Sequence, residues 1–160
     1  MMIFKVIENY ADMRFVYDLF RNNKNLDGKN TFESFEGDMT NRLKGYYHQF
    51  FVIYDEILKK RVGCIYTTAY RNIDGHCKLT MIIKEEYEGE FHTILRTFIK
   101  NIYNYYPIRK LFVETSDIRL KREYCLFGFE QEAQLRNYVF VNGEYADLAI
   151  LGYEVTKINE

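Results

Sequence analysis

A long helical repeat between two strand-like segments constrains the fold of this chain most strongly. From Glu88 to Tyr106 apolar residues recur at helical spacing, and Pro107 cannot continue that helix. The segments 77–84 before it and 110–114 after it are rich in residues that favour strands. Two strands joined through a long helix are typically parallel neighbours in one sheet. The sequence therefore predicts a parallel crossover.

Further strands and helices are predicted on both sides of this unit. In chain order they are a strand at 3–7, a helix after the cap residue Asn9, a weaker helix from about Thr31 to Leu43, strands at 50–54 and 62–70, a hairpin turn at Asp74-Gly75, a short helix that Ser116 or Asp117 can cap and Gly128 ends, and a hairpin around Asn142-Gly143. This order predicts a mixed α+β fold, with a mostly antiparallel mixed sheet and helices on both faces. We expect residues 1–160 to form a single domain.

Charge and composition exclude several classes of protein. With 22 Lys and Arg against 23 Asp and Glu, the net charge is −1, so no overall field attracts nucleic acid or an anionic membrane. We therefore expect neither as a partner. The N-terminus is too short and charged too early for a signal peptide, and no apolar run approaches the roughly 20 residues of a membrane span. A cytoplasmic protein is the expectation.

The three cysteines argue in the same direction. Cys64, Cys77 and Cys125 are odd in number and widely spaced, without a CxxC pair or histidines at ligand spacing. This pattern favours a reducing compartment, and we expect no bound metal.

The last third of the chain carries a more specific pattern. Tyr124 stands four residues before the pair Gly128-Phe129, and the segment 130–136 then leads to the hairpin at Asn142-Gly143. Together with the element order, this pattern resembles the GNAT superfamily of N-acetyltransferases, especially its ribosomal-protein and polyamine branch. The Leu135-Arg136 pair and the stretch 143–147 are similar to the ribosomal-protein subgroup. The resemblance implies a GNAT-like fold and an enzyme that uses acetyl-CoA to acetylate a primary amine of a small molecule or protein by direct attack.

The resemblance also implies roles for individual residues. Tyr124 would approach the cofactor sulfur as general acid, and the main-chain N–H groups of Ile82 and Ile83 would polarise the thioester. Asp117 falls near the expected pantetheine arm, although a helix cap explains it equally well. Tyr124 likewise has an alternative role as a helix residue that packs its ring on the sheet.

The general base is less defined. Glu114, on the strand after the long helix, is one candidate, and His76, at the hairpin, is another. Each is more often simply exposed or paired in proteins with this composition.

The expected phosphate-binding segment departs from the family pattern. The aligned residues are Gly89, Glu90, Phe91, His92 and Thr93. Glu88 replaces a basic or amide residue, and Phe91 and Thr93 replace small ones, so the backbone approach that glycine allows is lost. Four carboxylates, Glu85, Glu86, Glu88 and Glu90, favour a helix start but oppose an anion. A non-catalytic domain of this fold that binds a ligand or a protein is therefore the alternative function.

The acceptor site is only weakly indicated. The acidic residues Glu33, Glu36 and Asp38 could attract a cationic amine, although a solvated helix face also explains them. The polar loop from Arg21 to Asn30 would shape the pocket. An exposed edge strand in the tail makes a homodimer possible.

Overall fold

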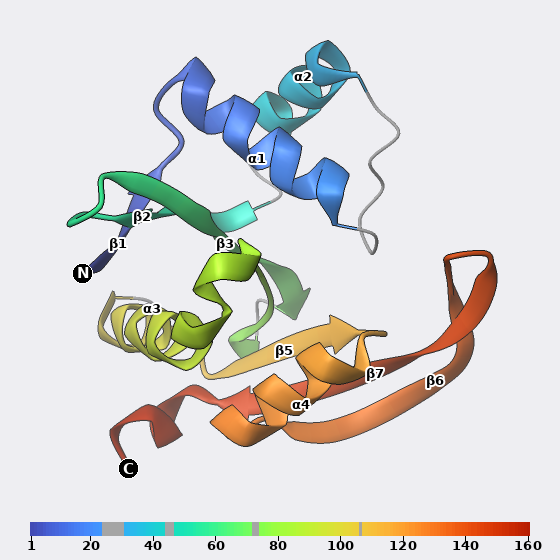
Figure 1. Cartoon of the computed structure of the whole chain (residues 1–160). Helices are drawn as coiled ribbons and strands as arrows, with labels where there is room; N and C mark the ends of the chain where they lie inside the picture. Colours follow the sequence, from blue (N-terminus) through green and yellow to red (C-terminus); the bar gives the residue numbers. More distant parts are fainter. Residues whose placement is uncertain (24–30, 44–46, 72–73, 106) are drawn as a thin grey trace. The chain divides into compact units, whose positions relative to one another are not determined.

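The computed structural model describes residues 1–23, 31–43, 47–71, 74–105 and 107–160 (Figure 1). Strands and helices follow in the predicted order. They are β1 (Met2–Val6), α1 (Tyr10–Asn22), α2 (Phe32–Arg42), β2 (Tyr47–Asp55), β3 (Lys60–Arg71), β4 (His76–Ile83), the 3₁₀ helix η2 (Glu85–Glu90), α3 (Phe91–Tyr105), β5 (Lys110–Thr115), α4 (Ile118–Phe127), β6 (Glu130–Val141), β7 (Glu144–Glu154) and the 3₁₀ helix η3 (Val155–Asn159).

The strands hydrogen-bond in the order β1-β2-β3-β4-β5-β7-β6. The neighbours β1 and β2, β2 and β3, β5 and β7, and β6 and β7 pair antiparallel. Strands β4 and β5, which flank α3, pair in parallel through His76–Lys78 and Lys110–Phe112. The predicted mixed sheet and the parallel crossover are thus confirmed.

The long helix begins later than the sequence predicts. Apolar spacing placed its start at Glu88, but the α-helix starts at Phe91. The acidic segment before it, Glu85–Glu90, forms η2 instead. A 3₁₀ turn at an α-helix N-terminus is common, and apolar periodicity cannot distinguish the two when the turn carries few apolar residues.

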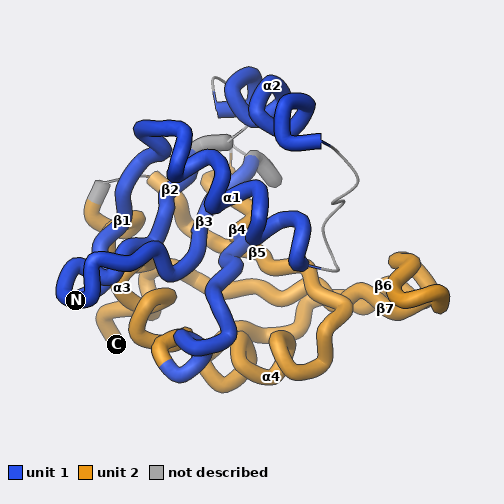
Figure 2. Tube along the Cα trace, turned by 45° about the horizontal axis from the view of Figure 1, so that its top comes forward, with its two compact units in different colours: residues 1–69, 80–89 blue, residues 70–79, 90–160 orange. Residues whose placement is uncertain are grey.

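The described chain divides into two compact units, residues 1–69 with 80–89 and residues 70–79 with 90–160 (Figure 2). The prediction of a single domain stays a prediction.

The core of the first unit lies between α1, α2 and the strands. Met13 and Val16 of α1 and Met39 of α2 pack with Phe50 of β2 and Tyr66 of β3. The Phe50 and Tyr66 rings stack with their centroids 4.8 Å apart. The apolar residues on one side of α1 therefore form its contact with the core, as the sequence predicts.

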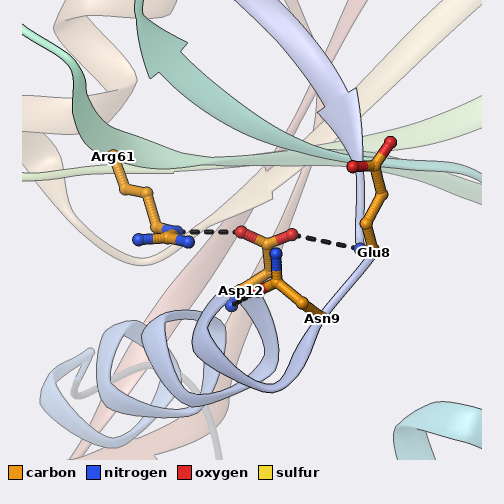
Figure 3. A network of polar contacts seen from close by, with 4 residues as sticks. All are labelled: Glu8, Asn9, Asp12 and Arg61. Atoms are coloured by element: carbon orange, nitrogen blue, oxygen red, sulfur yellow. Dashed lines mark hydrogen bonds and ion pairs between the residues drawn. The ribbon is translucent and has the colours of Figure 1, made fainter.

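A polar network holds the start of α1 to β3 (Figure 3). The Asn9 side chain caps the helix by accepting from the Asp12 N–H at 2.9 Å. The Asp12 carboxylate in turn accepts from the Arg61 Nε at 2.8 Å and from the Glu8 N–H at 3.0 Å. Asp12 is buried, so both of its carboxylate oxygens obtain their hydrogen bonds from the protein.

Removing the Asp12 carboxylate should therefore destabilise the fold. We expect Asp12→Ala to lower the free energy of unfolding by about 2 kcal/mol, since charged hydrogen bonds are lost and Arg61 keeps no carboxylate there. Asp18→Ala is the matched control, because its pair with Arg14 on the same helix is 3.8 Å long and exposed; it should cost less than about 0.5 kcal/mol. Urea denaturation measures both. Equal effects of the two variants would show that the network adds no stability.

The second unit has a separate core built on β5 and β7. The buried residues of α3 are Phe91, Ile94, Leu95, Phe98, Ile99 and Ile102, and those of the strands include Leu111, Val113, Leu151 and Tyr153. The predicted helix end at Gly128 and the predicted hairpin turn at Asn142-Gly143 are both confirmed. Gly128 ends α4 with a φ of 129°, and Asn142 and Gly143 have φ values of 52° and 84° at the tip of the β6–β7 hairpin.

Candidate active site

The aromatic cluster around Tyr124 is the best-defined candidate site. Tyr124 lies on α4 and is 1% exposed. Its ring meets the Phe91 ring at 5.0 Å and the Phe129 ring at 5.1 Å, both edge to face. All three side chains belong to the second unit.

The spacing of Tyr124, Gly128 and Phe129 has a local physical cause. The Phe129 N–H donates to the Tyr124 carbonyl at 3.0 Å, and the Gly128 N–H donates to the Cys125 carbonyl at 3.1 Å. These two bonds form a Schellman motif, which needs a residue with positive φ at Gly128. The motif turns the chain so that Phe129 folds back against Tyr124. The Tyr-x-x-x-Gly-Phe pattern thus fixes one wall of the Tyr124 environment.

Burial also controls the protonation of Tyr124. Loss of solvation raises the pKa of the Tyr124 hydroxyl above its ordinary value, so the side chain stays a neutral phenol at physiological pH. The raised pKa makes the Tyr124 hydroxyl a weaker acid than the hydroxyl of a free tyrosine. Tyr124 is therefore suited to donate a hydrogen bond to a developing thiolate and to release its proton only to a strong base.

Asp117 is the cap of α4. Its Oδ1 accepts from the N–H groups of Arg119 at 2.8 Å and Leu120 at 3.2 Å. Its own N–H donates to the Thr115 Oγ1 at 3.1 Å. These bonds support the capping role, and the role near a pantetheine arm stays a prediction.

The two candidate bases lie on the other face of β5 from the Tyr124 cluster. Leu111, Val113 and Thr115 are buried on one face, so Glu114 projects from the opposite one. The Lys78 Nζ lies 3.5 Å from its Oε2. The His76 ring packs edge to face on Phe112, which shares the face of Glu114, at 5.6 Å. The structure therefore does not bring Glu114 and Tyr124 together.

At the end of β4, Ile82 and Ile83 differ in orientation. The Lys84 N–H donates to the Val62 carbonyl of β3 at 2.9 Å, and a Cβ at Gly63 of β3 would lie 2.2 Å from the Ile82 carbonyl oxygen. Backbone groups alternate along a strand, so Ile82 points its carbonyl and N–H toward β3, and the Ile83 N–H points away from β3. Of the two predicted donors, only Ile83 is directed away from the neighbouring strand.

The segment aligned with a phosphate cradle is helical throughout. Gly89 and Glu90 are in η2, and Phe91, His92 and Thr93 form the first turn of α3. Phe91 is 5% exposed, and the His92 Nε2 lies 3.2 Å from the Glu123 Oε2. A Cβ at Gly89 would meet no atom within 4 Å, so packing does not require glycine there. The role of these residues in cofactor binding stays a prediction.

The acidic residues of α2 lie on its outer face. Glu33, Glu36 and Asp38 are exposed, whereas Phe35 and Met39 pack toward the core. The loop that should shape the acceptor pocket lies outside the described residues from residue 24 to residue 30.

Sequence reasoning missed the contact between Phe91 and Tyr124. It gave Phe91 two roles, as an apolar residue of the long helix and as part of the cofactor segment; the structure confirms the first, and the second stays a prediction. The described residues contain no group of three or more His, Cys, Asp or Glu side chains that could hold a metal ion. None of the described helices is long and apolar enough to cross a membrane.

Comparison with known proteins identifies the fold. No family model matches this chain, and no curated protein matches its sequence. Among solved structures, the matches have an N-acetyltransferase fold, so the GNAT-like fold predicted from the sequence is confirmed.

The matched structures include several forms of one bacterial enzyme. Spermidine N-acetyltransferase from Vibrio cholerae in complex with CoA and spermine has a TM-score of 0.86 and 19% identity, covering 99% of this chain and 98% of that one. A chimera of the Vibrio cholerae enzyme SpeG with hSSAT has a TM-score of 0.87 and 18% identity over 99% of this chain and 98% of that one. SpeG with manganese ions has a TM-score of 0.82 and 20% identity over 98% and 94%. Identities this low establish the fold alone.

Proposed function

We propose that this chain is an N-acetyltransferase that uses acetyl-CoA as co-substrate and acetylates a primary amine of a small molecule or protein. One observation carries the proposal. Tyr124 is a buried, neutral phenol that a Schellman motif fixes against Phe129, in a chain whose whole length has the acetyltransferase fold.

The proposed reaction needs two contributions from the chain. The amine nitrogen forms a bond to the thioester carbonyl carbon, the carbon–sulfur bond breaks, and the amine loses a proton while the thiolate gains one. The Ile83 N–H, which points away from β3, polarises the carbonyl. Tyr124 donates a hydrogen bond and then its proton to the sulfur. The proton of the amine passes to water, because Glu114 projects from the face of β5 opposite the Tyr124 cluster.

A polyamine is the acceptor that we propose to test first. Glu33, Glu36 and Asp38 place three exposed carboxylates on one helix, which favours a cation with several charges. The matched Vibrio cholerae structure contains spermine. A lysine-containing peptide carries only single amines and should be a weaker acceptor.

The test is direct detection of the acetylated product by mass spectrometry. The protein is incubated with acetyl-CoA and, separately, with spermine, spermidine and a lysine peptide. We expect acetylated polyamine, and binding of acetyl-CoA at about 100 times its Kd should stabilise the native state by roughly 2.7 kcal/mol. If acetyl-CoA at millimolar concentration gave no acetylated product and no thermal shift, the enzyme proposal would be refuted. The alternative, a non-catalytic binding domain, would then remain, and the acidic helix start at Glu88 favours it.

We also propose that a second copy of this chain covers the far end of the β6–β7 hairpin, which projects beyond β5 and α4 (Figures 1 and 2). Tyr138, Phe140 and Tyr145 are 63%, 65% and 68% exposed there, and β6 is an edge strand. An exposed aromatic edge strand favours isologous pairing. Phe140→Asp should therefore shift the mass found by light scattering toward the monomer, whereas Ile57→Asp, at an exposed turn, should not. A monomeric wild-type chain would refute the dimer.

The cysteine thiols support a reducing compartment. Cys64, Cys77 and Cys125 form no disulfide, and burial raises the pKa of the Cys77 thiol to about 11. On this basis we propose a cytoplasmic location.

A further inference from the structure

The backbone at the start of α3 is already hydrogen-bonded. The Tyr87 N–H donates to the Lys84 carbonyl at 2.9 Å, at the three-residue spacing of a 3₁₀ helix. Because η2 leads directly into α3, residues 89 to 93 lie in two consecutive helices. A phosphate cradle at a strand-to-helix turn needs successive N–H groups that point outward from the turn. Here a 3₁₀ helix takes the place of that turn.

The Phe91 side chain packs into the core at the start of α3. Its ring lies 5.0 Å from the Tyr124 ring and is 5% exposed, so it belongs to the core of the second unit. Removing this ring would leave a cavity beside Tyr124. The side chain that replaces a small residue of the family pattern is therefore part of the wall around Tyr124.

The charges at this position oppose an anion. Glu85, Glu86, Glu88 and Glu90 are exposed along η2. Two cations close by in the sequence lie over aromatic rings: the Lys84 Nζ is 5.4 Å from the centre of the Phe15 ring, and the Arg96 guanidinium is 5.2 Å from the centre of the Phe127 ring. A pyrophosphate placed here would meet four carboxylates.

From these three observations we infer that the chain recognises its thioester donor through the acetyl-pantetheine end and gains little from the nucleotide. This inference rests on the proposed function and specifies its donor. Tyr124, the residue that the proposed function assigns to the sulfur of the thioester, lies on α4 and not in η2. The donor class is thus an acetyl thioester of pantetheine, with or without the adenosine phosphates.

The test compares kcat/KM for acetyl-CoA and S-acetyl-pantetheine with one polyamine acceptor. We expect values within about fivefold, because a difference of 1 kcal/mol or less is about a factor of 5. A preference for acetyl-CoA of about 100-fold or more, equivalent to roughly 2.7 kcal/mol, would overturn the inference and leave the proposed function intact. Turnover of neither donor would overturn both.

A binding measurement gives a readout that does not depend on turnover. Calorimetry with adenosine 3′,5′-bisphosphate, the nucleotide part without pantetheine, should show no binding at concentrations up to about 1 mM, which corresponds to less than roughly 4 kcal/mol. A Kd in the low micromolar range would overturn the inference even if both thioesters were used.

A matched pair of exposed glutamates tests the role of charge. Glu90→Lys should raise kcat/KM for acetyl-CoA about tenfold and leave that for S-acetyl-pantetheine unchanged, because only the former carries phosphates. Glu144→Lys makes the same charge change at the hairpin tip and should alter neither. Equal gains from both variants would assign the effect to net charge and overturn the assignment to the helix start. Phe91 itself is left in place because its loss would disturb the core.

Discussion

Tyr124→Phe is expected to lower kcat for acetyl transfer by about 10²–10³-fold while donor affinity stays nearly constant. The hydroxyl supplies a proton in the transition state, and positioned acids contribute roughly 10²–10⁴-fold to such steps. The ring remains, so its contacts with Phe91 and Phe129 are kept. Steady-state kinetics with a polyamine acceptor, together with a thermal shift titration of acetyl-CoA, measures the two quantities separately.

Tyr153→Phe is the control for the loss of a hydroxyl in the same cluster. Tyr153 is buried, and its ring stacks on Phe129 at 5.1 Å. Its substitution should leave kcat within about threefold, since no proton transfer is assigned to it. Folding should survive Tyr124→Phe, because the ring and its contacts with Phe91 and Phe129 remain. Wild-type kcat in Tyr124→Phe would remove Tyr124 from the mechanism.

The environment of Tyr124 was predictable from sequence only in part. The helix stop at Gly128 and the return of Phe129 are local, because a Schellman motif is encoded within six consecutive residues. The contact with Phe91 joins two helices and depends on packing in three dimensions. The helical spacing of Phe91 with Ile94 and Leu95 predicts that Phe91 lies on the apolar face of the long helix, but it does not predict which residue of another helix Phe91 contacts.

The candidate base shows a second limit. Glu114 was selected by its residue type and its place after the long helix, although strand alternation with the buried Val113 and Thr115 already puts it on the opposite face. The Lys78 Nζ lies 3.5 Å from the Glu114 Oε2 on that face. The type of a residue predicts which chemistry its side chain can perform. Side chains alternate along a strand, so the position of the residue decides on which face of the sheet that chemistry can take place.

The second large effect is expected at Gly63 of β3. A Cβ there would lie 2.2 Å from the Ile82 carbonyl oxygen and 2.8 Å from the Ile83 Cα, and both are backbone atoms that cannot rotate away. Gly63→Ala should therefore force β3 and β4 apart and lower the free energy of unfolding by about 3 kcal/mol, at the upper end for overpacking. The midpoint of urea denaturation, with its slope unchanged, measures the loss.

Gly37→Ala is the matched control, because a Cβ at Gly37 in the middle of α2 would meet no atom within 4 Å. It should stabilise the chain by about 0.5–1 kcal/mol, since alanine loses less conformational entropy in a helix. Because the two substitutions should change the free energy of unfolding in opposite directions, the comparison distinguishes crowding between β3 and β4 from a general effect of alanine. Since the Ile83 N–H lies at the point where Gly63 meets β4, Gly63→Ala should also reduce kcat in the protein that remains folded. Stability equal to wild type would mean that β3 and β4 tolerate a wider spacing, and the orientation assigned to Ile83 would then lose its support.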